Sequence, residues 1–206
     1  MQIRRHEENL WKKANRAAVW LQVVPFVRFV AVTGSLGRGE AKPDSDADLM
    51  VVTEPGRLYT ARAFALTLLQ ATSQRVNVEA GRIGGTVDPN YWLTSDNLDI
   101  QPHNAYVARD YTYTMPLWDS SEIYSRLTHT NPWVAEYKRK FRDVVPPRQF
   151  LVLRAIQYSA ELLCRLWPGL EVWTKSVQEK TIRAFAERQS NLDKVVLTDH
   201  ELRLHL

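Results

Sequence analysis

The sequence predicts an α+β fold, in which a small mixed β-sheet is covered by packed helices and followed by a helical C-terminal extension. Strand, turn, strand, helix and strand patterns follow one another between residues 27 and 80, and helical periodicity dominates from about residue 104 onward. The length of 206 residues allows one core and a smaller helical part. We therefore expect a core over residues 1–145 and an extension over residues 146–206, with Pro146-Pro147 as the hinge.

The first elements of the core have clear patterns. Apolar residues recur at helical intervals over residues 3–21 and predict an amphipathic helix. The β-branched run at residues 27–33 predicts a strand that stops at Gly34, and residues 47–53 predict a second strand. An apolar stripe over residues 57–72 predicts a helix that packs on the sheet.

Later elements are less regular. A third strand is predicted at residues 76–80 and a short one at residues 91–94. Helical patterns over residues 149–166 and 177–186 make up most of the extension.

Composition indicates an ordinary folded protein. With 45% hydrophobic and 24% charged residues, disordered and fibrous classes are excluded. The formal charge of +4 makes polyanions acceptable partners, but interspersed acidic residues favour an ordinary surface over a nucleic-acid groove.

Cys164, the single cysteine, excludes an intrachain disulfide and fits a cytoplasmic location. The apolar stretch at residues 17–32 is interrupted by Gln22, Pro25 and Arg28, so no membrane span is predicted.

One segment carries the residues that suggest chemistry. Gly34 and Ser35 form a turn at a strand end, where successive backbone N–H groups can hold phosphate. Asp46 and Asp48 follow at an interval of two, which directs both carboxylates to one face of a strand. Asp44 has the same spacing, but its neighbours belong to a turn, so we choose the later pair.

Two neighbouring carboxylates repel each other unless a cation lies between them. Hard oxygen ligands without a nearby His or Cys cluster favour Mg²⁺ or Mn²⁺ over zinc. The five histidines have no paired ligand spacing. The sequence therefore predicts a divalent-cation site at Asp46 and Asp48.

The segment from Gly34 to Leu49 resembles the signature of the DNA polymerase β-like nucleotidyltransferase superfamily, a hydrophobic strand, Gly-Ser, a short spacer and Asp-x-Asp. The resemblance implies that Asp46 and Asp48 bind two divalent ions and that Gly34-Ser35 holds the triphosphate of a nucleotide, with ATP expected. Arg38 is a candidate phosphate contact. Further segments resemble a prokaryotic branch of predicted nucleotidyltransferases: Arg82-Ile83-Gly84-Gly85, Tyr91-Trp92-Leu93, Met115-Pro116-Leu117 and Asn131-Pro132-Trp133-Val134.

The resemblance also implies a third acidic ligand on a later strand. Glu79 is our choice, because a carboxylate binds a hard cation better than Asn77, which shares its strand face. Asp88 is the second candidate and Asp99 the third.

The expected activity is metal-dependent transfer of a nucleoside monophosphate from a nucleoside triphosphate to a hydroxyl acceptor, with release of pyrophosphate. The acceptor is left open among a small molecule such as an aminoglycoside, a protein side chain and an RNA 3′ end. The extension would supply acceptor binding or dimer contacts, so a homodimer is expected. The alternative is a catalytically inactive nucleotide-binding or RNA-binding module that kept the fold.

Overall fold

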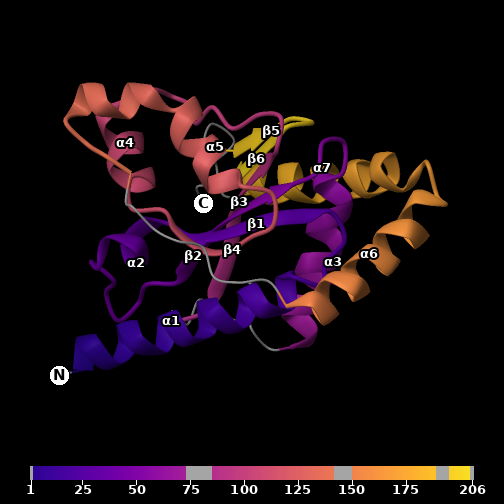
Figure 1. Cartoon of the computed structure of the whole chain (residues 1–206), viewed down its shortest axis with the longest axis horizontal. Helices are drawn as coiled ribbons and strands as arrows, with labels where there is room; N and C mark the ends of the chain where they lie inside the picture. The colour runs from indigo at the N-terminus through magenta and orange to yellow at the C-terminus, as the bar shows by residue number, and fades with distance from the viewer. Residues whose placement is uncertain (1, 73–84, 142–149, 189–194, 205–206) are drawn as a thin grey trace.

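The computed structural model describes residues 2–72, 85–141, 150–188 and 195–204. A six-stranded mixed sheet runs through the molecule, with helices on both of its faces (Figure 1). The strands are β1 (Val27–Val32), β2 (Ala47–Thr53), β3 (Val87–Thr94), β4 (Met115–Asp119), β5 (Val195–Leu197) and β6 (Glu201–Leu204). The helices are α1 (Gln2–Leu21), α2 (Gly34–Arg38), α3 (Leu58–Ala71), α4 (Ala105–Tyr111), α5 (Ile123–Thr130), the 3₁₀ helix η2 (Pro132–Tyr137), α6 (Leu151–Arg165) and α7 (Leu170–Arg188).

The strand order is β4-β1-β2-β3-β6-β5. All neighbouring strands are antiparallel except β2 and β3, which run parallel and place Asp48 opposite Asp88. β6 pairs with β3, so the end of the extension belongs to the same sheet as the core. The predicted α+β class with a mixed sheet is confirmed.

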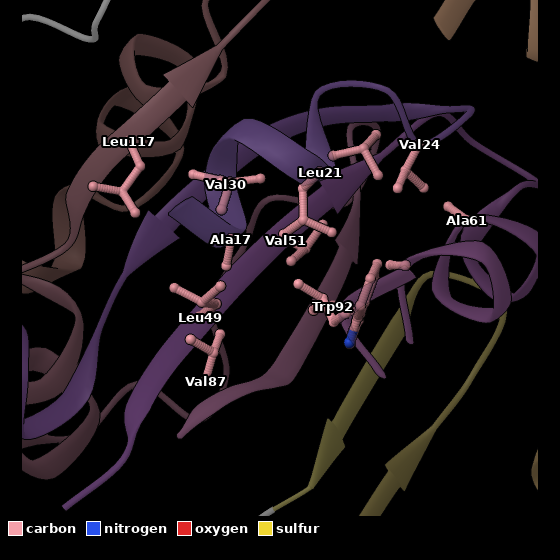
Figure 2. Packing of buried hydrophobic residues seen from close by; sticks show 14 of the residues in the cluster. Ala17, Leu21, Val24, Val30, Leu49, Val51, Ala61, Val87, Trp92 and Leu117 are labelled. Carbon is pink, nitrogen blue, oxygen red and sulfur yellow. The ribbon is translucent and has the colours of Figure 1, made fainter. Parts of the chain in front are cut away.

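Alternating side chains give the sheet two apolar faces. Val30 and Leu49 face the layer that contains α1 and α3, and Figure 2 shows them together with Ala17 of α1 and Ala61 of α3. Phe29 belongs to the opposite cluster, which is completed by side chains from α4, α5 and η2. Both faces of the sheet are therefore covered by apolar clusters.

The clearest sequence patterns gave the most accurate elements. α1, β1, β2, α3 and α6 agree with the predictions to within two residues at each end. β3 is longer than the short strand predicted at residues 91–94. The strand predicted at residues 76–80 and the hinge at Pro146-Pro147 lie outside the described residues.

Two strand regions were not predicted. β4 lies in the part of the chain where helical periodicity dominates, and it contains Pro116. β4 is an edge strand, where a missing N–H costs no ladder hydrogen bond. β5 and β6 are three and four residues long, too short to produce a recognisable period. Within the described residues, no helix is long and apolar enough to cross a membrane.

α6 is attached to the core through polar groups. Glu161 is buried and accepts hydrogen bonds from the backbone N of Phe26 at 2.8 Å and from Arg28 Nη1 at 2.6 Å. Gln157 is also buried, and its Nε2 donates to the carbonyl oxygens of Val24 and Val27 at 2.8 Å. The side of α6 that faces the protein is therefore largely polar.

Glu161→Ala should lower the free energy of unfolding by about 2 kcal/mol or more, because it leaves the Phe26 N–H and the partly buried Arg28 guanidinium without this acceptor. Urea denaturation measures the effect. Glu187→Ala, at an exposed position of α7, is the control and should change stability by less than about 0.5 kcal/mol. Equal effects of the two substitutions would contradict the role of Glu161.

Candidate active site

The candidate site lies where β1 ends and β2 begins. The backbone N of Thr33 donates to the carbonyl oxygen of Asp48 at 3.0 Å, which brings the turn after β1 against the first residues of β2. Gly34 has a φ of +62°, and a Cβ at this position would lie 2.4 Å from Asp48 Oδ2. Only glycine therefore allows this close approach.

Gly34 and Ser35 begin the short helix α2, with Thr33 as the N-cap residue. The first N–H groups of a helix have no acceptor within the helix, and they remain available to an anion. Buried Leu36 holds α2 in place, and Gly37 packs so closely that a Cβ there would lie 2.6 Å from the carbonyl oxygen of Tyr113. The turn is thus fixed beside Asp48 by packing.

The predicted aspartate pair lies at the start of β2. Asp46 Oδ1 accepts hydrogen bonds from the backbone N and the Oγ1 of Thr86, both at 2.8 Å. Asp48 Oδ1 accepts from Asn90 Nδ2 at 2.8 Å. Asp44 is exposed and precedes the strand, as the choice of the later pair assumed.

The structure describes two of the three candidates for the third carboxylate. Glu79 and Asn77 lie outside the described residues. Asp88 lies directly opposite Asp48 in the parallel register of β2 and β3. Asp99 is partly exposed and contacts His103 Nε2 at 2.8 Å. Among the described candidates, Asp88 is the one adjacent to the pair.

Asp48 has an unusual environment for an acid. Burial, followed by the neighbouring carboxylates of Asp88 and Asp46, raises its pKa to about 7, although the hydrogen bond from Asn90 opposes the shift. Asp110 of α4 adds a smaller effect in the same direction. The site therefore holds more negative charge than its own residues compensate.

We tested whether these residues fit a divalent cation. In the described part of the chain, neither Asp46 nor Asp48 has an ion pair with a basic side chain. The same part contains no group of three His, Cys, Asp or Glu side chains arranged to hold a metal. Mg²⁺ is commonly held by one or two carboxylates together with substrate phosphates and water. The uncompensated pair fits such a shared ion, which the described residues do not enclose by themselves.

Arg38, at the end of α2, belongs to a charged network beside the site. Its Nε donates to Glu40 Oε2 at 2.9 Å, and its Nη1 contacts Asp110 Oδ1. Arg109 Nη2 also donates to Glu40 Oε2, at 2.8 Å. Arg38 ends the helix that begins at the turn, and it is already paired with two carboxylates.

The sequence analysis did not single out Thr86, Asn90 or Asp110. Asn90 follows Asp88 at an interval of two on β3, a spacing that could have identified it. Asp110 has no such signal, because its position depends on the packing of α4 against α2.

The site combines a mixed sheet, a glycine turn at the end of β1 and adjacent carboxylates at the start of β2. Residues 13–87 match the family model described as "Nucleotidyltransferase domain". The match confirms the resemblance to the polymerase β-like superfamily. It includes the turn and the Asp46 and Asp48 pair and ends one residue before Asp88. No curated protein and no solved structure matches the chain.

Asp48→Asn should stabilise the metal-free protein at alkaline pH. The folded-state pKa of Asp48, about 7, lies above its ordinary value of 3.8, so wild type loses stability relative to the variant as the pH rises through this interval. The full shift corresponds to about 4 kcal/mol. We expect about 2 kcal/mol between about pH 4 and pH 8, because Asp48 is partly solvent-exposed.

Urea denaturation in EDTA at several pH values measures this difference. Asp44→Asn, at an exposed position of the same loop, is the matched control and should show little pH-dependent change. A stability difference between wild type and Asp48→Asn that does not vary with pH would refute the raised pKa.

Proposed function

We propose that the protein transfers a nucleoside monophosphate from a nucleoside triphosphate, with ATP as the first candidate, to a hydroxyl acceptor and releases pyrophosphate. The main support is the contact between the Gly34 turn and Asp48, in a segment that matches a nucleotidyltransferase domain. This contact would let the N–H groups of the turn bind an anion beside carboxylates that bind a cation. A triphosphate with its divalent ion needs both.

In the proposed mechanism, the N–H groups at Gly34 and Ser35 bind phosphate oxygens and orient the triphosphate. Asp46 and Asp48 would hold Mg²⁺ or Mn²⁺. When bound, this ion neutralises phosphate charge and lowers the pKa of a nearby hydroxyl. A third carboxylate, Asp88 or Glu79, would complete the cation ligands near the acceptor hydroxyl. The acceptor oxygen bonds to the α-phosphorus, the bond to pyrophosphate breaks, and the hydroxyl proton leaves to a base or to solvent.

Asp46 is positioned for this role by Thr86, which donates two hydrogen bonds to one of its oxygens. Asn90 fixes Asp48 in the same way. Each carboxylate therefore keeps its second oxygen for a ligand. Such fixed orientation is what charge stabilisation in phosphoryl transfer requires.

The alternative is a nucleotide-binding or RNA-binding module without catalysis. It is favoured by one observation, that no complete group of three acidic ligands lies within the described residues. The presence of Glu79 in the matched segment leaves room for the missing ligand. An activity experiment separates the two functions.

Label transfer from α-labelled and γ-labelled nucleoside triphosphates should identify the reaction. In the presence of Mg²⁺ or Mn²⁺ and a cell extract as the acceptor source, we expect label from the α position only. Asp46→Ala plus Asp48→Ala should abolish it, because both cation ligands are lost. Asp44→Ala is the matched control and should retain activity, since Asp44 is exposed and precedes the strand.

Transfer of γ-label, or α-label transfer that survives the double substitution, would refute the proposed reaction. Nucleotide binding without any transfer would favour the non-catalytic module. The labelled species itself identifies the acceptor class as small molecule, protein or RNA.

The third ligand can be assigned by comparing Asp88→Asn with Glu79→Gln. We expect Asp88→Asn to lower kcat by at least about 100-fold, in keeping with the loss of a charged group at the reacting phosphates. Glu79→Gln should then have less than a tenfold effect. The measurement is steady-state transfer at saturating Mn²⁺, and the reverse order of effects would assign the role to Glu79.

A further inference from the structure

α6 has its apolar side on the outside of the protein. Large apolar side chains on α6 and the turn after it are between 48 and 82% exposed, while Gln157 and Glu161 are buried. The exposed residues that matter most are Val152, Ile156, Leu162, Leu163, Leu166 and Trp167, which we call the outer face of α6. Figure 1 shows α6 at the margin of the molecule, beyond α3. This arrangement reverses the usual polarity of a surface helix.

The outer face is shaped for close contact with another helix. Ala155 and Ser159, four residues apart and both exposed, lie along its middle, with Val152 and Leu162 in line with them. Small residues at the centre of a helix face let two backbones approach, and larger apolar residues on both sides then interlock. Ser159 Oγ donates to the carbonyl oxygen of Ala155 at 3.0 Å. The hydroxyl would therefore keep a hydrogen-bond partner within the helix if an interface buried it.

The outer face is also large enough for a stable dimer. Leu151 and Tyr158 extend it, and residues of this kind have on the order of 200 Å² of surface each, so together they expose on the order of 1,000 Å². Monomeric proteins rarely expose patches above about 600 Å². A standard protein–protein interface takes about 800 Å² from each partner. The exposed apolar area therefore meets the requirement of a dimer.

Charge on α6 argues against a lipid or nucleic-acid partner. Arg165, at the border of the outer face, is paired with Glu54 at 2.7 Å, and the acidic residue of the helix, Glu161, is buried. Arg154 also has an interaction partner within the protein. Binding to anionic lipid or RNA depends on rows of available cations. The outer face provides apolar contacts but no such row of available cations.

We propose that the outer face of α6 is a homodimer interface, in which the α6 helices of two copies pack against each other across a two-fold axis near Ala155 and Ser159. A two-fold interface brings the same surface of both copies together, and a face with a small centre and large apolar borders is complementary to itself. The stacked rings of Trp167 and Trp173, with centroids 6.1 Å apart, continue the apolar surface onto α7. This proposal is independent of the proposed catalytic function.

The molar mass in solution tests the proposal. Above about 10 µM, wild type should sediment as a dimer, because interfaces of this size have dissociation constants in the micromolar range or below. Leu162→Glu should weaken the dimer by at least about 100-fold, since it places a charge in the apolar contact. Tyr106→Glu is the matched control, at an exposed aromatic residue of α4 away from α6, and should remain dimeric.

Circular dichroism verifies that the variants are folded. If Leu162→Glu does not fold, Ser159→Cys decides instead, because residues near a two-fold axis form a disulfide between copies under oxidising conditions. A covalent dimer of Ser159→Cys would support the proposal, and its absence would overturn it. A monomeric wild type, or an assembly that folded Leu162→Glu leaves unchanged, would overturn it as well.

Discussion

The structure of the site depends on the antiparallel pairing of β1 with β2 at the point where β1 ends. The hydrogen bond from Thr33 N to the carbonyl oxygen of Asp48 carries the pairing one residue beyond β1 and leaves no room for a side chain at residue 34. This single constraint sets the place of α2 and the direction of Asp48. It also explains why the sequence changes abruptly from β-branched residues to glycine at this position.

The same constraint explains how much of the site was visible in the sequence. Gly34, Asp46 and Asp48 are close in the chain, at the ends of two strands joined by a short connection, so local patterns were sufficient to propose them as one site. Asp88 joins them through the parallel pairing of β2 with β3, which is a property of the sheet and not of either segment. Asp110 joins through the packing of α4, and no spacing in the sequence indicates it.

The elements of the fold divide in the same way into those that local patterns predicted and those that they did not. β1 and β2 are buried strands with strong β-branched patterns, and both were predicted to within one residue at each end. β4 was missed because an edge strand needs fewer backbone hydrogen bonds and accepts Pro116, which a central strand would not. α6 was predicted from its period alone. The period locates an apolar side but gives no information about which side faces the core.

The two edges of the described sheet have a consequence for how copies of the protein can associate. β4 carries a proline, and β5 on the opposite edge is only three residues long. Unpaired strands of this kind are poor templates for strand addition from another chain. The sheet is thus protected against growing from one molecule into the next, which is a common route to aggregation. Any ordered contact between molecules is left to the helical surfaces.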